Sequence, residues 1–484
     1  MISKLPVLSL ATGLAVAVAA QAQDAAPLSA IDWLSDSVAI PVALPAVPSH
    51  PTEPPVASDA RPDEVTVIPL EELNEDAVGL FPAASRGLPT DLWSGSGSDV
   101  LAISRAPHLK ATQDLLHDLF AAEAKAPAGQ SENAFLLARI DALINVGALS
   151  TARALLDLSG REEPRSFRRW FDIALLTGQE NGACSAMRRL PQVTPTYPAR
   201  VFCLARSGDW RAAALTLETG TSLGVIGKAE AERLRLFLDP EAGPAMLPPP
   251  ATPSPLDFAI HAATGEPLRS TDLPIAFAHA DLRPMNGWKA RLDAGERLAR
   301  AGAIPTARLW DIYHESRPAA SGGVWDRVAA VQTLDTAIEE QDADAIEMAL
   351  PKAWEAMNEA GLAPQLAERH AAALNNLGLD MAADGVAGKL GGLLGIAALS
   401  WPETDLGEAI RAGLETTEIS ASDRAMIDEG RIGEVALAAI ARLDEGVEGN
   451  LDAIRAGLSL LREAGLEDRA ETAARELAIL GPGT

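Results

Sequence analysis

Six glycines in this chain share a spacing that constrains how it can fold. Each is followed five residues later by an alanine, and five of the six are preceded by a leucine four residues earlier. The first three glycines are 31 and 30 residues apart, which indicates a repeating unit in that part of the chain. The pairs are Gly147 with Ala152, Gly178 with Ala183, Gly208 with Ala213, Gly302 with Ala307, Gly378 with Ala383, and Gly465 with Ala470.

The spacing predicts pairs of helices joined at each glycine. Glycine adopts the left-handed conformation that ends a helix without a steric clash of a Cβ atom. The small alanine then lets the second helix approach the first closely. One helix pair cannot bury its apolar face alone, so neighbouring pairs are expected to stack. We therefore predict an all-α fold, a helical-hairpin solenoid preceded by an extended, proline-rich N-terminal segment.

The segment Gly208-Asp209-Trp210-Arg211-Ala212-Ala213 resembles the turn and second-helix start of a tetratricopeptide repeat. It has the glycine, an aromatic residue two positions later and an alanine five positions later. The resemblance is strongest over residues 130–240, although the family's bulky first-helix residues and closing proline are not consistently present. The period is also shorter than the usual 34 residues. Tetratricopeptide-like arrays are generally protein-interaction scaffolds, and the resemblance implies that role here.

Proline-rich stretches divide the chain into regions. Eight prolines from Pro41 to Pro69 predict an extended, partly disordered segment over residues 23–105. Within it, residues 65–68 and 87–93 are either short strands or extended pieces that dock on the helices. Residues 106–240 are predicted to form the tetratricopeptide-like repeats. Seven prolines in residues 240–255 predict a linker over 241–256, followed by a second, less regular helical-repeat region over 257–484.

The N-terminus has the pattern of a secretory signal peptide. Lys4 precedes an uncharged apolar run over residues 5–20, and Ala20-Gln21-Ala22 is a small-x-small cleavage site. We therefore expect cleavage after Ala22, which makes residues 1–22 the signal peptide, and export to the periplasm, with secretion as the alternative. An uncleaved anchor is the other interpretation of this run. No later segment is long and apolar enough to span a bilayer, so no transmembrane segment is expected in the mature chain.

The chain has two cysteines, Cys184 and Cys203. An even number of cysteines in an exported protein indicates a disulfide. The prolines between them predict that the chain turns back, which would bring the two thiols of adjacent repeats together. Such a bond would stabilise the fold by roughly 3 kcal/mol in the chain-entropy description. The alternative is a pair of buried, inert thiols.

The sequence contains no recognisable catalytic, cofactor or metal motif, so we predict that the protein is not an enzyme. None of its seven histidines has a paired metal-binding spacing such as HExxH. The glycine-rich stretch over residues 385–395 lacks the Gly-Lys-Ser/Thr ending of a phosphate-binding loop. The formal net charge of −27 disfavours binding to nucleic acid.

Together these features predict a non-enzymatic scaffold that binds another envelope protein, or a peptide, through its helical-repeat surface. Ile31, Trp33 and Leu34 form an apolar cluster that could dock on a partner or in the array's own groove. The alternative is an accessory factor in cell-wall metabolism that binds glycan or a peptidoglycan hydrolase. A groove lined by aromatic side chains and carboxylates would favour glycan, whereas an apolar or charge-patterned groove would favour protein.

Overall fold

The computed structural model describes residues 77–93, 95, 106–160, 163–241, 248–382, 384–416 and 418–481, all within the compact unit Leu70–Thr484. Across these ranges the chain forms α-helices, 3-10 helices and two isolated β-bridges, Val78–Ala124 and Phe81–Ala122, but no strand. The predicted all-α, helical-repeat-like fold is therefore confirmed. Within the same ranges, no helix combines the length and apolarity needed to cross a bilayer.

Several features expected from the sequence lie outside the described residues. They are the signal peptide over residues 1–22, the cluster Ile31, Trp33 and Leu34, and the extended piece over residues 65–68.

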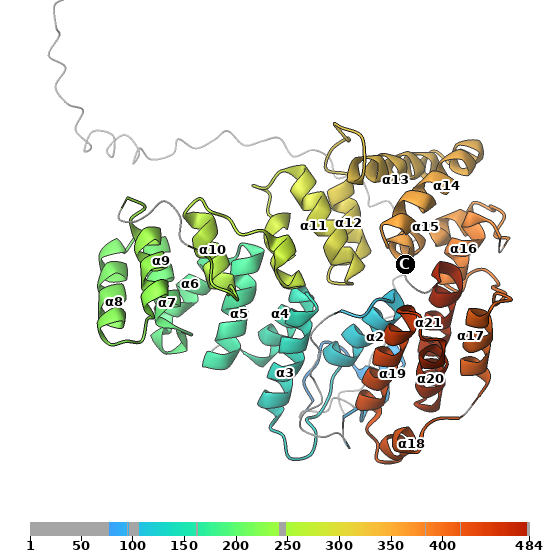
Figure 1. The fold of residues 1–484 in the computed structure, drawn as a ribbon, viewed down its shortest axis with the longest axis horizontal. Helices are drawn as coiled ribbons and strands as arrows, with labels where there is room; N and C mark the ends of the chain where they lie inside the picture. Colours follow the sequence, from blue (N-terminus) through green and yellow to red (C-terminus); the bar gives the residue numbers. More distant parts are fainter. Residues whose placement is uncertain are drawn as a thin grey trace, which may run out of the picture. The chain divides into compact units, whose positions relative to one another are not determined.

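The first helices follow one another as contacting pairs, seen in blue-green to green in Figure 1. α3 packs on α4, α5 on α6, and α7 on α8, which is the arrangement expected of helical hairpins. The helices are α2 (Lys110–Ala121), α3 (Glu132–Asn145), α4 (Leu149–Ser159), α5 (Pro164–Thr177), α6 (Glu180–Arg189), α7 (Tyr197–Arg206), α8 (Trp210–Ser222) and α9 (Lys228–Leu238).

The later helices are less regular in length and spacing. The sequence pattern does not predict the 3-10 helix η5 (Ile275–Leu282) or α17 (Asp405–Glu415). The remaining helices are α10 (Pro255–Ala263), α11 (Trp288–Arg300), α12 (Thr306–Tyr313), α13 (Val324–Glu339), α14 (Ala343–Glu359), α15 (Ala363–Asn376), α16 (Val386–Leu393), α18 (Ala421–Asp428), α19 (Ile432–Val447), α20 (Leu451–Glu463) and α21 (Glu467–Leu480). Short 3-10 turns are η2 (Ala83–Arg86), η3 (Pro191–Val193) and η4 (Ser270–Asp272).

Helix α5 illustrates how local sequence sets the helix ends. The Glu163 side chain accepts a hydrogen bond from the backbone N–H of Ser166, which satisfies a free donor of the first turn. Pro164 follows at the first helical position, where its missing N–H costs nothing. Gly178 ends the helix in the left-handed conformation, with φ of 75°.

The six glycines of the sequence pattern all have positive φ, between 64° and 85°, and each lies at or just after the end of a helix. Residues with a Cβ atom rarely adopt this backbone conformation, which explains why glycine recurs at these positions. Four of the associated alanines are fully buried at 0% exposure: Ala152, Ala183, Ala213 and Ala470.

The pattern does not hold at Ala307, and the sixth alanine is not among the described residues. Ala307 is exposed, because Thr306 and Leu309 of α12 occupy the buried positions and leave Ala307 on the outer face. Ala383 lies outside the described residues, and α16 begins only at Val386, so Gly378 is not followed directly by a second helix.

Part of the predicted extended N-terminal segment docks on the helices. In residues 77–93, the side chains of Leu88, Leu92 and Trp93 are buried. The Trp93 ring lies with its centroid 5.7 Å from that of Phe135, and the Gly433 N–H donates to the Leu92 carbonyl oxygen at 2.7 Å. This piece of chain therefore belongs to the helical core, and of the two expectations for it, docking rather than a strand is correct.

Most buried apolar side chains of the described residues belong to two clusters. One apolar cluster joins the segment around Trp93 and helices α2 to α10 with the C-terminal helices α17 and α19 to α21. A second cluster contains side chains of α11 to α16. The C-terminal helices reach the first cluster through α2, which packs on both α19 and α21. In an open solenoid each repeat contacts only its neighbours, so this closure is a departure from that arrangement.

Candidate functional site

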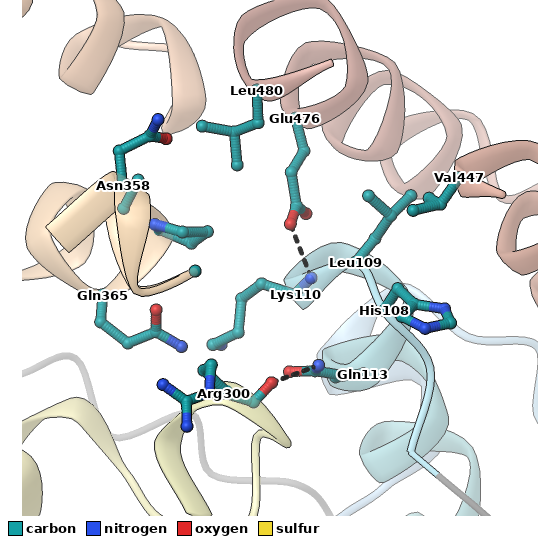
Figure 2. Close-up of a pocket in the computed structure, with 13 residues that line it drawn as sticks. His108, Leu109, Lys110, Gln113, Arg300, Asn358, Gln365, Val447, Glu476 and Leu480 are labelled. Atoms are coloured by element: carbon teal, nitrogen blue, oxygen red, sulfur yellow. Dashed lines mark hydrogen bonds between the residues drawn. The ribbon is translucent and has the colours of Figure 1, made fainter. Parts of the chain in front are cut away.

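A cleft of about 430 Å³ lies beside α2, with walls from α15 and α21. Arg86 of η2 and Leu393 and Leu394, at the end of α16, complete its lining. A smaller cavity of about 30 Å³ adjoins the start of α2, and Figure 2 shows side chains converging there from α2, α15 and α21. The cleft thus lies where segments far apart in the sequence meet.

Glu476 of α21 caps the first turn of α2. Its carboxylate accepts hydrogen bonds from the backbone N–H groups of Lys110 and Ala111, at 2.7 and 2.8 Å. Leu109, the residue before the helix, has no side chain able to do this. Burial raises the pKa of Glu476 to about 7, and the two backbone hydrogen bonds offset only part of that increase. One residue therefore joins the start of the array to its end.

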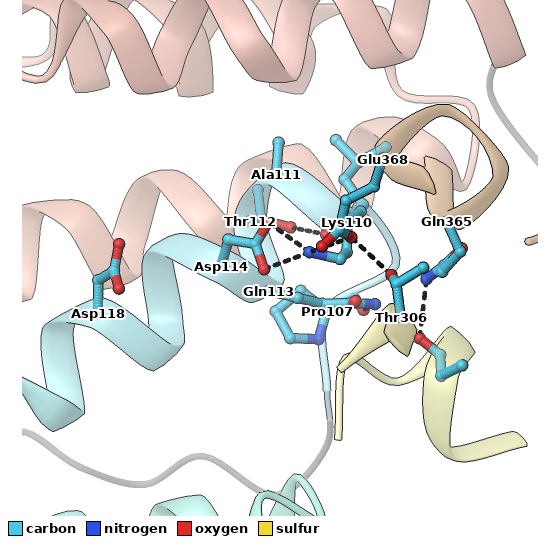
Figure 3. Close-up of polar contacts among 12 residues, drawn as sticks. Pro107, Lys110, Ala111, Thr112, Gln113, Asp114, Asp118, Thr306, Gln365 and Glu368 are labelled. Carbon is cyan, nitrogen blue, oxygen red and sulfur yellow. Dashed lines mark hydrogen bonds and ion pairs between the residues drawn. The ribbon is translucent and has the colours of Figure 1, made fainter. Parts of the chain in front are cut away.

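The Lys110 side chain lines the cleft, and Figure 3 shows its polar contacts. Its Nζ donates to both carboxylate oxygens of Asp114, one turn along α2. Glu368 of α15 lies 4.0 Å from the same Nζ and accepts a hydrogen bond from the Thr306 hydroxyl at 2.6 Å. Three helices, α2, α12 and α15, are thus linked by polar contacts at this edge.

Two buried glutamines fix α2 and α15 to the end of α11. The Gln113 side-chain amide of α2 donates to the Arg300 carbonyl oxygen at 2.7 Å, and that of Gln365 donates to the Ala299 carbonyl oxygen at 2.9 Å. The last carbonyl groups of a helix have no partner within the helix. The two amides therefore satisfy acceptors of α11 and set the position of its C-terminus beside the cleft.

An arginine of α21 also lines the cleft. Arg469 pairs with Asp118 of α2 at 2.6 Å and donates to the carbonyl oxygen of Arg86 at 2.9 Å. Burial lowers the pKa of His117, which keeps this ring neutral near pH 7. Leu394, 45% exposed, supplies an apolar surface at the rim.

The far end of α2 is held by Arg139 of α3. This fully buried guanidinium donates to the carbonyl oxygens of Phe120, Ala122 and Val78 at 2.6 to 2.9 Å. Burial lowers its pKa to about 10, with the charge of Glu132 opposing the shift. Both ends of α2, which lines the cleft, are therefore held by side chains from other helices.

Two histidines that are distant in sequence meet at one buried carboxylate away from the cleft. The two oxygens of Asp335 lie 2.7 Å from Nε2 of His314 and 2.8 Å from Nε2 of His370. Burial alone would raise the pKa of Asp335, but these histidines lower it below its ordinary value. The sequence spacing gives no sign of this cluster. In the described part of the chain, no group of three or more His, Cys, Asp or Glu side chains is arranged to hold a metal ion.

The disulfide predicted from the sequence is confirmed. Cys184 of α6 and Cys203 of α7 are bonded, with their Cα atoms 5.0 Å apart. The bond therefore links consecutive helical hairpins.

Comparison with known proteins finds no family model, no curated protein and no solved structure that matches this chain.

Proposed function

We propose that the protein is an exported, non-enzymatic scaffold of the bacterial envelope, and that the cleft beside α2 binds a polypeptide segment of a partner. The observation that carries this proposal is the lining of the cleft, which combines cations, carboxylates and exposed leucine. Its volume of about 430 Å³ falls in the range of ligand-binding clefts. The resemblance of residues 130–240 to tetratricopeptide repeats and the signal-peptide pattern of residues 1–22 support the scaffold role and the location.

The charge pattern favours protein over glycan as the ligand. The described lining contains carboxylates but no Trp, Tyr or Phe side chain on which a sugar ring could stack. The cleft is lined by two oppositely charged pairs, Lys110 with Asp114 and Arg469 with Asp118. A polypeptide with side chains of both signs can match this pattern. Binding of cell-wall glycan remains the alternative outcome of the test.

The test is a crosslinked pull-down from the envelope with a Leu394→Glu variant. Leu394 is exposed at the rim of the cleft, so glutamate there should block binding and leave the fold intact. The matched control is Leu158→Glu on α4, since Leu158 is 59% exposed and lies outside the cleft. We expect one partner to be captured by the wild type and the control but lost with Leu394→Glu.

Direct binding then tests the proposal with purified components. The captured partner, or its crosslinked peptide, should bind the wild type and the Leu158→Glu control equally and the Leu394→Glu variant at least about tenfold more weakly. Equal binding to all three proteins would show that the cleft is not the site. Binding to purified peptidoglycan, or its cleavage, would instead support the cell-wall alternative.

A further inference from the structure

Positive charge is concentrated in one part of this acidic chain. Residues 164–238, which form α5 to α9, contain eleven Arg and Lys but only six Asp and Glu, whereas the whole chain carries −27. Such local reversal of sign creates a field that attracts anionic partners toward that region. The cleft beside α2 has no part in it, because none of the residues that line that cleft lies within 164–238.

A hollow of about 110 Å³ lies between α6 and α7 in this basic region. α6 lines it with Cys184, Met187 and Arg188, spaced three and four residues apart, so that all three share one face of the helix. α7 contributes a matching face, which consists of Arg200, Cys203, Leu204 and Ser207. The Cys184–Cys203 disulfide joins these two faces. The hollow is therefore a groove that combines apolar side chains with one arginine from each helix.

Neither arginine has a counter-ion among the described residues. Other arginines of this region do: Arg206 pairs with Glu180, and Arg235 with Glu218, both at 3.2 Å. Arg188 and Arg200 are exposed, and no ion pair or side-chain hydrogen bond joins either of them to another described residue. Two exposed guanidinium groups that line the same hollow can both donate hydrogen bonds to an anion bound there.

The helix dipole stabilises the charge of only one of these two arginines. Arg188 is in the last turn of α6, where a positive charge is favourable. Arg200 lies near the N-terminal end of α7, where the helix dipole gives a positive charge no stabilisation. The helix dipole therefore does not stabilise the charge of Arg200, which is exposed and available to pair with an anion.

We propose that the groove between α6 and α7 binds an acidic segment of a partner polypeptide. One apolar side chain of that segment would occupy the hollow against Met187 and Leu204, and adjacent carboxylates would pair with Arg188 and Arg200. Guanidinium groups form strong, often bidentate hydrogen bonds with carboxylates. A walled hollow for one apolar side chain is suited to a peptide, whereas a membrane surface requires no such hollow.

The test measures binding of a short fluorescein-labelled peptide, in which glutamate alternates with leucine, by fluorescence anisotropy. The protein is the full mature chain with its disulfide intact. We expect binding that weakens as salt is added and that falls at least about tenfold in the Arg188→Gln/Arg200→Gln variant. The matched control is Arg165→Gln/Arg168→Gln, because these are exposed arginines of α5 outside the groove. The control should bind the probe as the wild type does.

Thermal denaturation shows whether the variant is folded, and the same variant should unfold near the wild-type temperature because both arginine side chains are exposed. Three results would overturn the proposal: no binding of the acidic probe, equal weakening in both double variants, or equal binding of the matching lysine–leucine peptide. Binding to phosphatidylglycerol vesicles in place of the peptide, or self-association that depends on Arg188 and Arg200, would also overturn it by identifying a lipid surface or a second copy as the ligand.

This inference does not depend on the function proposed for the cleft. Leu394→Glu should leave binding of the acidic probe unchanged, and Arg188→Gln/Arg200→Gln should leave capture through the cleft unchanged. Failure of one proposal is therefore distinguishable from failure of the other.

Discussion

Replacing Glu476 with alanine tests how the start of the helical array is joined to its end. The carboxylate of Glu476 accepts the backbone N–H groups of Lys110 and Ala111, which are 366 and 365 residues away in sequence. Truncation removes both acceptors and leaves the first turn of α2 uncapped, because Leu109 has no side-chain acceptor. The variant therefore loses the cap of α2 and a contact between α2 and α21 together.

The expected cost follows from these two hydrogen bonds. A buried donor left without an acceptor costs about 1–3 kcal/mol, and loss of a capping side chain costs about 0.5–2 kcal/mol. Water from the adjoining cleft can solvate part of the exposed turn, so we expect a total of about 2–4 kcal/mol for Glu476→Ala. Glu476→Gln keeps one acceptor oxygen and should cost about 1 kcal/mol.

The pH dependence gives an independent check. Burial raises the pKa of Glu476 to about 7 from its ordinary 4.5. Between these two pH values the folded protein keeps the proton on Glu476, whereas the unfolded chain has released it. The stability that the protonated Glu476 carboxyl contributes is fully present below about pH 4.5 and is lost as the pH rises to about 7. Glutamine cannot ionise, so the free energy of unfolding of the wild type should fall relative to that of Glu476→Gln across this range.

The assay is urea denaturation followed by circular dichroism at several pH values between 4.5 and 8, together with hydrogen exchange at the Lys110 and Ala111 amides. Glu471→Gln is the control, because Glu471 lies on the same helix, is 52% exposed and pairs with Arg475 of that helix. If Glu476→Ala destabilises no more than that control, or if exchange at the two amides is unchanged, the proposed cap is wrong.

The other predictions concern the remaining fixed points of the fold. Reducing the Cys184–Cys203 bond should destabilise the protein by roughly 3 kcal/mol, measured by denaturation with and without reductant; equal midpoints would contradict this. Arg139→Met should cost at least about 3 kcal/mol, because three backbone carbonyl groups lose their buried donor; a cost near zero by urea denaturation would refute the role given to Arg139. Gly302→Ala should cost more than Gly378→Ala in the same assay. A Cβ at 302 would lie 2.7 Å from Gln113 Oε1, whereas at 378 it meets nothing within 4 Å; equal costs would mean that α2 is not packed on this turn.

Features set by neighbouring residues could be predicted from the sequence. Gly178 and Pro164 mark the ends of α5 through their own backbone preferences, which do not depend on the rest of the fold. The same is true of Cys184 and Cys203, because the turn between them is encoded by the intervening prolines. In these cases short-range chemistry is sufficient.

Other features depend on contacts between distant residues and had no sequence signature. Glycines at 407 and 413 lower the helix propensity of α17, yet a Cβ at 413 would lie 2.9 Å from Leu458, so packing on α20 accounts for the glycine there. Glu476 looks like any other acidic residue of an amphipathic helix, and its partner is a backbone more than 360 residues earlier. The cleft could not be predicted for the same reason, since its walls come from helices that the pattern places far apart.

The closure through α2 also limits how this architecture can change in length. An open array can gain or lose terminal units and keep the others folded. Here, deleting α21 would remove Glu476 from the first turn of α2 and Arg469 from Asp118, and so would disturb the opposite end of the chain. Duplication of a C-terminal hairpin would displace the same contacts. The contact between α2 and α21 therefore constrains how many helices can lie between these two, and a shortened or lengthened variant would need a different contact to close the array.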